Sequence, residues 1–416
     1  MSVSGLAPFD RRGHQRRVII DMLRHVRMAA RTDIAAATGL SPQVVTSLVE
    51  ELLREGLIEE RGRRPSARGQ PPVDLALNPE GGFAIGVQVE AGRLTGILCD
   101  LGANIRARTT LVCRTDDPDT ALESLRHLID DLTGRAGVDM ARLWGVGIVL
   151  PGPFGSVDEN ERDPLAMPAW SRAQFRERFA AALSLPVFVG NDATAAAIGE
   201  HLNGVARDLR TFFYLYISEG IGGGLFVEGQ PVMGAFGNAG EIGRMHLGLP
   251  SADGPVRLEA IASVDALRRM LVAAGHLDAV DLDHEALFAA DATILDEWLE
   301  GAAQCLRVAI ANIENLFDPE AVVMGGQVPD RYLGEILARM QPLLPSVSQR
   351  SDRPSKRILI GRAGGDSAAL GGATLPLFSR LTTQPRATRA RPRPTRQPVQ
   401  RELSGGDLAV GGRPHD

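Results

Sequence analysis

The 416 residues carry 45 Lys and Arg against 51 Asp and Glu, with 44% hydrophobic and 5% aromatic residues. This length excludes a single small module and predicts two or three domains, each with its own core. The sequence has no apolar run near the roughly 18 residues of a membrane span, and its N-terminus lacks a signal-peptide pattern. We therefore expect a cytoplasmic protein without a membrane partner. Cys99, Cys113 and Cys305 match no disulfide or zinc spacing.

The charges are unevenly distributed along the chain. Residues 1–72 contain 12 Arg and 8 acidic residues, residues 380–416 contain 8 Arg and 3 acidic residues, and the body between them has 25 basic and 40 acidic residues. Basic ends fit contact with a polyanion, although a solvated surface has the same composition. The Arg- and Pro-rich tail at 381–416 has no apolar stripe, so we expect it to be disordered. It either adds nonspecific DNA affinity or has no role.

The stretch from His14 to Leu77 has the pattern of three helices and a hairpin. The first helix is indicated by a buried stripe at helical spacing, formed by Ile19, Met22, Leu23 and Val26. A second helix is expected to begin with Thr32 as its N-cap and to end at Gly39. Ser41 followed by Pro42 predicts the start of a third helix. The buried side of the third helix is expected to be Val45, Leu48, Val49 and Leu52.

The N-terminal end of the third helix presents short side chains, as the end that enters a major groove does in helix-turn-helix proteins. The DNA-binding candidates there are Ser41, Gln43, Val44, Thr46 and Ser47. A basic, proline-rich hairpin follows, whose candidates for phosphate or minor-groove contacts are Arg61, Arg63, Arg64 and Arg68. Residues 1–80 are thus predicted to form a winged helix-turn-helix domain. The alternative is a protein–protein helical module with a solvated loop.

From Phe83 the pattern changes to short strands. Strands are expected at 83–90, 93–101 and 104–112, followed by a helix around 122–129 and a buried strand in the stretch LWGVGIVLPG. A further strand runs directly into a helix at LPVFVGNDATAAAIGEHL, and the second half repeats the theme up to a closing helix. This order predicts an α/β fold with two lobes, at about 81–190 and 191–380.

Several of these stretches resemble motifs of the ROK family (repressors, open reading frames, kinases), in particular its transcriptional-repressor branch. Residues 30–60 are similar to the family's DNA-binding helices. The successive kinase-fold motifs are matched, in the family's order, by VGIVLPGP, VFVGNDATAAAIGE, ISEGIGGGLFVEGQPVMGAFGNAGEIG, LEAIAS, AVVMGGQVP and GGDSAALGGA. The resemblance implies a winged helix-turn-helix followed by a two-lobed, actin-like (ribonuclease H-like) sugar kinase fold over 81–380.

The resemblance also exposes departures at the nucleotide site. Family kinases hold ATP phosphates on a hairpin that reads approximately DxGGTK, whereas this chain has Gln88 in place of the aspartate and Glu90 where phosphate oxygens lie. One like-charge contact at about 4 Å costs roughly 4 kcal/mol at an effective dielectric constant near 20. In the second glycine-rich loop, Glu219 replaces the usual threonine. We therefore expect no phosphoryl transfer and no cofactor.

The sugar side of the family's site is better preserved. The resemblance implies effector contacts from Asn191 and Asp192, the latter matching the kinase base, and from Glu241 and Glu259, which match two hydroxyl-binding glutamates. Asp192 is alternatively only a helix N-cap, and Glu259 only a surface acid. Arg244 stands where the family has histidine, with His246 two positions later, and an arginine there favours a sugar phosphate or sugar acid. The family's zinc-binding cysteines are missing between Leu247 and Leu258, so no metal is expected.

Together these features predict a DNA-binding transcriptional regulator, a repressor of carbohydrate metabolism, that senses a sugar or sugar phosphate between its lobes. We expect a homodimer or homotetramer on a palindromic double-stranded DNA operator. Two alternatives stay open. The first is a sugar kinase that phosphorylates a hexose with ATP and carries a DNA-binding appendage. The second is a module whose body binds another protein.

Overall fold

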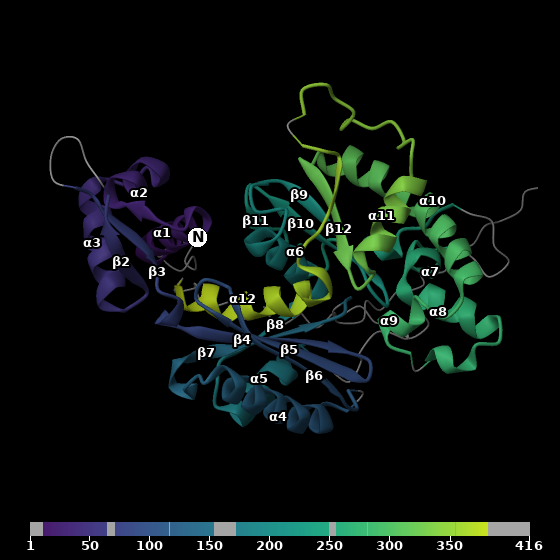
Figure 1. The fold of residues 1–416 in the computed structure, drawn as a ribbon, viewed down its shortest axis with the longest axis horizontal. Helices are drawn as coiled ribbons and strands as arrows, with labels where there is room; N and C mark the ends of the chain where they lie inside the picture. The colour runs from purple at the N-terminus through teal and green to yellow at the C-terminus, as the bar shows by residue number, and fades with distance from the viewer. Residues whose placement is uncertain are drawn as a thin grey trace, which may run out of the picture.

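The computed structural model describes residues 11–64, 71–115, 117–153, 172–248, 255–280, 282–353 and 355–381. A small N-terminal unit is followed by two α/β lobes, each built on a five-stranded sheet (Figure 1). The N-terminal unit lies at one end of the molecule, and the helices between residues 259 and 339 lie at the other. Within the described ranges, none of the helices combines the length and apolar character that crossing a bilayer requires.

The N-terminal unit has the predicted order of helices and hairpin. Its elements are α1 (Arg11–Val26), β1 (Ala29–Ala30), α2 (Arg31–Thr38), α3 (Pro42–Arg54), β2 (Ile58–Arg63) and β3 (Val73–Leu77), with the strands in the order β1-β3-β2. The predicted start of α3 is confirmed, because the Ser41 hydroxyl accepts the N–H of Val44 at 3.5 Å and Pro42 is the first helical residue. The predicted buried side of α3 is also confirmed.

Two details of these helices differ from the prediction. Val26 is 44% exposed at the end of α1, and Ile20 is buried instead, so the stripe is centred on Ile19, Ile20 and Leu23. The N-cap of α2 is Ala30 and not Thr32. Alanine has no capping oxygen, and the Asp33 carboxylate accepts the N–H of Ala30 at 3.0 Å. The predicted end of α2 at Gly39 is confirmed by a left-handed φ of 68°.

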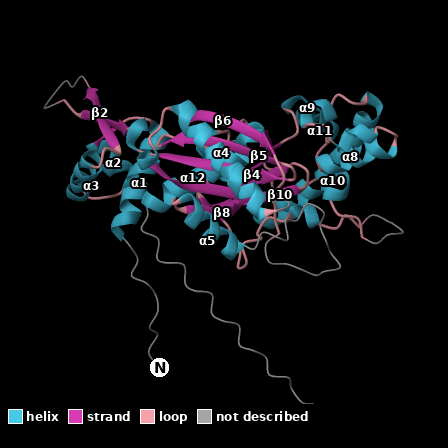
Figure 2. Cartoon of the chain, turned by 90° about the horizontal axis from the view of Figure 1, so that it is seen from below, coloured by secondary structure: helices cyan, strands magenta, loops and turns pink. Residues whose placement is uncertain are grey.

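The first lobe is built on a mixed sheet with the strand order β6-β5-β4-β7-β8. Its strands are β4 (Phe83–Glu90), β5 (Arg93–Asp100), β6 (Ile105–Val112), β7 (Leu143–Leu150) and β8 (Val187–Asn191). One face is covered by α4 (Pro118–Ala136) and α5 (Arg172–Leu183), as seen in Figure 2, and the other by α12 (Ser367–Leu381). The short 3-10 turns of this half are η1 (Pro79–Gly81) and η2 (Met140–Arg142).

The second lobe repeats this topology. Its strands are β9 (Phe212–Ile217), β10 (Ile221–Val227), β11 (Gln230–Pro231), β12 (Ala321–Gly326) and β13 (Ile358–Ile360), in the order β11-β10-β9-β12-β13. In both sheets the first three strands are antiparallel and the last two are added in parallel. This duplicated sheet confirms the predicted two-lobed fold.

The helices of the second lobe lie mostly beyond its sheet. They are α6 (Asp192–Asn203), α7 (Glu259–Ala262), α8 (Val264–Ala273), α9 (His284–Leu287), α10 (Ala292–Phe317) and α11 (Asp330–Arg339), with η3 (Ile242–Arg244), η4 (Leu277–Val280) and η5 (Gly364–Asp366). The central helix α10 buries one whole side, from Leu295 to Ile313, in the core of this lobe. Since α6 begins where β8 ends, its first turn lies between the lobes.

The closing helix α12 returns to the first sheet and packs against α6. A side chain at Gly86 would overlap the backbone of Ala369, and one at Gly371 would overlap the backbone of Ala195. These two glycines therefore let α12 approach both β4 and α6 closely. As a result, the pair of helices α6 and α12 joins the two lobes. The range 191–380 was expected to form the second lobe, but its last helix, α12, covers the sheet of the first lobe.

The N-terminal unit is docked on the body. Its core continues into Leu101, Trp144 and Leu377 of the first lobe. The Arg24 guanidinium donates to the carbonyl of Leu101 at 3.3 Å, and Arg207, in the loop after α6, donates to the carbonyls of Arg24 and His25 at the end of α1. Contacts with both lobes thus fix α1.

Candidate effector cleft and DNA-binding surface

The centre of the candidate cleft is the junction between β8 and α6. The Asn191 side chain caps α6 by accepting the N–H of Thr194 at 2.9 Å, and the Asp192 carboxylate accepts the N–H of Ala193 at 2.7 Å. A side chain at Gly152 would overlap the Glu241 carboxylate and would come within 2.9 Å of the Asn191 amide. Gly152 thus leaves room for both of these side chains.

Four of the six predicted effector residues lie around one cavity of about 70 Å³ between the lobes, and these are Asn191, Asp192, Glu241 and Glu259. Glu241 precedes η3, and Glu259 is the first residue of α7. A side chain at Gly243 would come within 2.9 Å of a Glu259 carboxylate oxygen. Carboxylates and amides in such an arrangement can each engage neighbouring hydroxyl groups of a sugar.

The carboxylate of Asp192 has an unusual acidity. Burial, together with the nearby carboxylates of Glu241 and Glu90, raises its pKa to about 7. The protonated form is therefore well populated near neutral pH, and in that form the group both donates and accepts a hydrogen bond. A pKa near 7 also suits a general base.

Arg244 and His246 do not line this cavity. Arg244 is the last residue of η3, and His246 is exposed and pairs through its backbone with Arg257. The described part of the cavity wall is instead acidic, with the carboxylates of Glu90, Asp192, Glu219, Glu241 and Glu259. The geometry therefore does not support the anionic ligand that Arg244 suggested, because these carboxylates would repel a phosphate.

The two departures on the first hairpin bind the opposite lobe. The buried Gln88 amide donates to the Tyr216 hydroxyl on β9 at 2.8 Å, and the Gln327 amide after β12 donates to the Glu90 carboxylate. Burial raises the pKa of Glu90, and the hydrogen bond from Gln327 opposes that rise. Gln88 and Glu90 of β4 thus each form a hydrogen bond between the two lobes.

Glu219, in the second glycine-rich loop, is held by two basic groups. Its Oε1 accepts from Arg268 on α8 at 2.8 Å and lies 3.0 Å from Nε2 of His284 on α9. Burial raises the pKa of Glu219, but these two partners outweigh burial and leave it below its ordinary value. The charge of Glu219, which replaces the family's threonine, is therefore largely balanced by partners in its own lobe.

The DNA-binding candidates lie on α3 and the hairpin after it. Among them, Ser41, Gln43, Thr46 and Ser47 are exposed, and Val44 is partly buried against the core. On β2, Arg61 and Arg63 are exposed, and Arg61 lies 2.6 Å from the Glu59 carboxylate. Arg64 forms ion pairs with Asp74 at 2.6 Å and Asp33 at 2.9 Å, so it joins the hairpin to α2. Arg68 lies outside the described residues.

Similarity to known proteins accounts for nearly all of this architecture. The model of the ROK family matches residues 84–378, which is more than half of the chain. The chain belongs to the ROK family. A xylose repressor of Bacillus spizizenii (strain ATCC 23059 / NRRL B-14472 / W23) is 26% identical over 383 residues, covering 88% of this chain and 95% of that repressor.

Solved ROK structures support the same fold. The crystal structure of a ROK family transcriptional regulator, a homologue of the E. coli MLC protein, superposes with a TM-score of 0.66 at 23% identity and covers 88% of this chain and 98% of its own. The ROK hexokinase of Thermus thermophilus gives a TM-score of 0.53 at 26% identity, covering 72% of this chain and 98% of its own. Residues 84–416 make up less than 88% of the chain. The xylose repressor and the ROK transcriptional regulator, which each cover 88% of it, therefore also match part of the N-terminal unit.

Several residues of the cleft were not found by sequence reasoning. Tyr216 and Gln327 hold the first hairpin, and Arg268 and His284 hold the second. They come from elements far apart in the sequence. A signal existed for Gln327, which lies in the motif AVVMGGQVP, and for Tyr216, which lies two residues before the glycine-rich loop.

Proposed function

We propose that this ROK protein is a transcriptional repressor of sugar-utilisation genes, whose DNA affinity is controlled by a sugar bound between its lobes. The observation that carries the proposal is the match to a xylose repressor over 88% of this chain, through both the N-terminal unit and the body. The described geometry agrees with it, because the chain combines an exposed polar helix end and a basic hairpin with an acidic cleft.

In this proposal residues 1–80 bind the operator, 81–380 form the sensor, and 381–416 form a tail. The N-terminal end of α3 enters the major groove with Gln43, Thr46 and Ser47, which read base edges. The exposed arginines of β2 contact phosphates. A homodimer presents two such units to a palindromic operator, and a homotetramer presents two pairs.

The effector that suits the cleft is a neutral sugar. Asn191, Asp192, Glu241 and Glu259 offer oxygen acceptors and an amide donor to hydroxyl groups. The acidic wall disfavours a phosphorylated sugar. The sequence suggested either a sugar or a sugar phosphate as the effector, and we propose only the neutral sugar.

Sugar phosphorylation is the alternative function, and Asp192 favours it because a carboxylate with a pKa near 7 could act as the base. Against it stand the two hairpins, whose acidic residues are engaged in contacts within the protein and face the place of a triphosphate. Catalysis of phosphoryl transfer depends on electrostatic stabilisation of phosphate charge. A coupled assay of ATP consumption across hexoses separates the two functions, and we expect no sugar-dependent turnover.

The test of DNA binding is footprinting of the full chain on genomic fragments around its own gene. We expect two protected half-sites about one helical turn, or a multiple of it, apart. Replacing both Arg61 and Arg63 by alanine should weaken operator binding and reduce the slope of log K against log salt by about one per lost phosphate contact. Arg135→Ala, an exposed position on α4, is the matched control. Unchanged slopes in the double variant would exclude phosphate contacts by the hairpin.

A further inference from the structure

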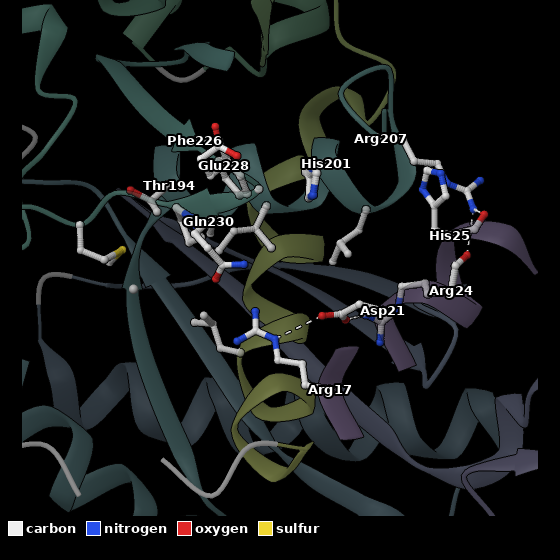
Figure 3. A pocket seen from close by; sticks show the side chains of 18 of the residues that line it. Arg17, Asp21, Arg24, His25, Thr194, His201, Arg207, Phe226, Glu228 and Gln230 are labelled. Atoms are coloured by element: carbon white, nitrogen blue, oxygen red, sulfur yellow. Dashed lines mark hydrogen bonds and ion pairs between the residues drawn. The ribbon is translucent and has the colours of Figure 1, made fainter. Parts of the chain in front are cut away.

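A second and larger cavity lies between the N-terminal unit and the second lobe. Its volume is about 470 Å³, within the range of roughly 300–1,000 Å³ that is typical of small-molecule sites. Figure 3 shows Arg17, Asp21, Arg24 and His25 of α1 on one side and Thr194, Phe226, Glu228 and Gln230 on the other. The cavity is therefore bounded by the unit proposed to bind DNA and by the lobe that carries the cleft.

The base of this cavity is apolar. It is formed on α6, β10 and α12 by Ala195, Ile198, Leu202, Phe226 and Leu375. The Phe226 ring is stacked on Phe212 at a centroid distance of 4.7 Å, which gives this wall a fixed aromatic surface. Such a wall suits the hydrocarbon or aromatic body of a ligand.

The rim of the cavity is charged, with more cations than anions. Three guanidinium groups, of Arg17, Arg24 and Arg207, stand against the carboxylates of Asp21 and Glu228. The Glu228 carboxylate is further balanced by an ion pair with Arg210, which does not line the cavity. The net charge around an anionic group at this rim is therefore positive, and it attracts the group.

All three arginines have contacts within the protein. Arg24 binds Asp21 and the carbonyl of Leu101, and Arg207 binds the carbonyls at the end of α1. Arg17 lies one turn of α1 before Asp21, at 3.3 Å from its carboxylate, and its side chain is 27% exposed. An acid group in the cavity offers the Arg17 guanidinium, which lines it, a second acidic partner beside Asp21.

We propose that this cavity binds an amphipathic organic anion, a carboxylic or sulfonic acid with an apolar body. Its acid group is met by Arg17 at the rim, and its apolar body lies on Ile198, Leu202 and Phe226. The neutral-sugar cleft and this cavity then take ligands of opposite character.

The position of the cavity gives the ligand a regulatory consequence, which rests on the proposed function. Asn191 borders both the cleft and this cavity, and α6 runs from one to the other. A ligand in contact with both α1 and α6 stabilises the docked position of the N-terminal unit. It therefore changes operator affinity only to the extent that the docked and undocked arrangements differ in affinity for DNA.

The probe for this site is 8-anilinonaphthalene-1-sulfonate, an aromatic sulfonate that fluoresces when it leaves water. Titration of the full chain, without DNA or sugar, should give saturable binding of about one probe per chain. Arg17→Glu and Met233→Trp should each raise the dissociation constant about tenfold, the first by reversing the charge and the second by filling the cavity from an exposed rim position. Arg54→Glu, an exposed charge reversal on α3 of the same unit, should leave it unchanged.

Equal affinity of all three variants for the probe would overturn the proposed site, provided that near-UV circular dichroism shows them folded. Weakening by Arg54→Glu as strong as by Arg17→Glu would also overturn it, since it would indicate binding to a basic surface. The titration contains no operator, so its failure leaves the repressor function untouched. Conversely, a chain that binds the probe and no DNA would retain the site and lose the proposed function.

Discussion

Replacing Asp192 by asparagine is expected to raise the free energy of unfolding by about 2 kcal/mol at pH 8. Burial and the neighbouring carboxylates raise the pKa of Asp192 from an ordinary 3.8 to about 7 in the folded chain. The folded state therefore binds more protons than the unfolded state between these two pH values, and stability falls as the pH rises through this window. The full rise corresponds to roughly 4 kcal/mol, and we halve it because Asp192 is partly exposed to solvent.

The measurement is urea unfolding of both proteins at pH 5 and pH 8. Above pH 7 the native carboxylate is charged among other carboxylates, so asparagine should be more stable there, and its advantage should shrink toward pH 4. Asp130→Asn, at an exposed position on α4, is the matched control and should show no such difference. A destabilised Asp192→Asn chain at pH 8 would contradict the account of the cleft as a group of crowded acids.

Replacing Glu219 by alanine is expected to lower the free energy of unfolding by about 2 kcal/mol near neutral pH. The change removes from Arg268 and His284 the carboxylate that joins α8 and α9 to the glycine-rich loop. Loss of one partner from a buried pair typically costs about 3–5 kcal/mol, and this pair is only partly buried. Because its partners hold the pKa of Glu219 below the ordinary value, this stabilisation is present above about pH 4.5 and is lost as the pH falls further.

A double-mutant cycle with His284→Ala isolates the contact. We expect a coupling energy of about 1 kcal/mol between Glu219 and His284. Glu285→Ala, at the adjacent exposed position on α9, provides the control and should show no coupling. An additive cycle, with a neutral Glu219→Ala, would show that Glu219 is a solvated charge in the loop and would restore the simpler view of it as a repelling group.

Much of the fold could be predicted because its signals are local. The strands at 83–90 and 105–112 and the end of α2 at Gly39 follow from alternation, apolar runs and a left-handed turn. The N-cap of α2 was misplaced at Thr32 because the actual cap is supplied from three residues later, by Asp33. The return of α12 to the first sheet depends on close backbone contacts at Gly86 and Gly371. The periodicity of apolar residues in the sequence does not indicate such contacts.

The cleft residues that lie within one sequence motif could be predicted. The contacts between residues that are far apart in the sequence could not. Asn191 and Asp192 lie at a strand-to-helix junction, so the sequence places them together. Arg244 was expected to contact the effector because it stands where the family has histidine, but it does not line the cavity. The contacts of Gln88 and Glu90 with the opposite lobe join residues more than a hundred positions apart, and only the folded chain brings them together.

Control of DNA binding by the sugar is tested by a calorimetric titration of sugar into the protein, with and without a saturating operator duplex. A panel of neutral pentoses and hexoses is screened first by thermal shift to find the sugar that stabilises the chain. If sugar binding controls DNA binding, the operator must change the sugar's dissociation constant by the same factor by which the sugar changes the operator's, and we expect about tenfold. Equal dissociation constants for the sugar in the two titrations would show that the sugar does not control DNA binding.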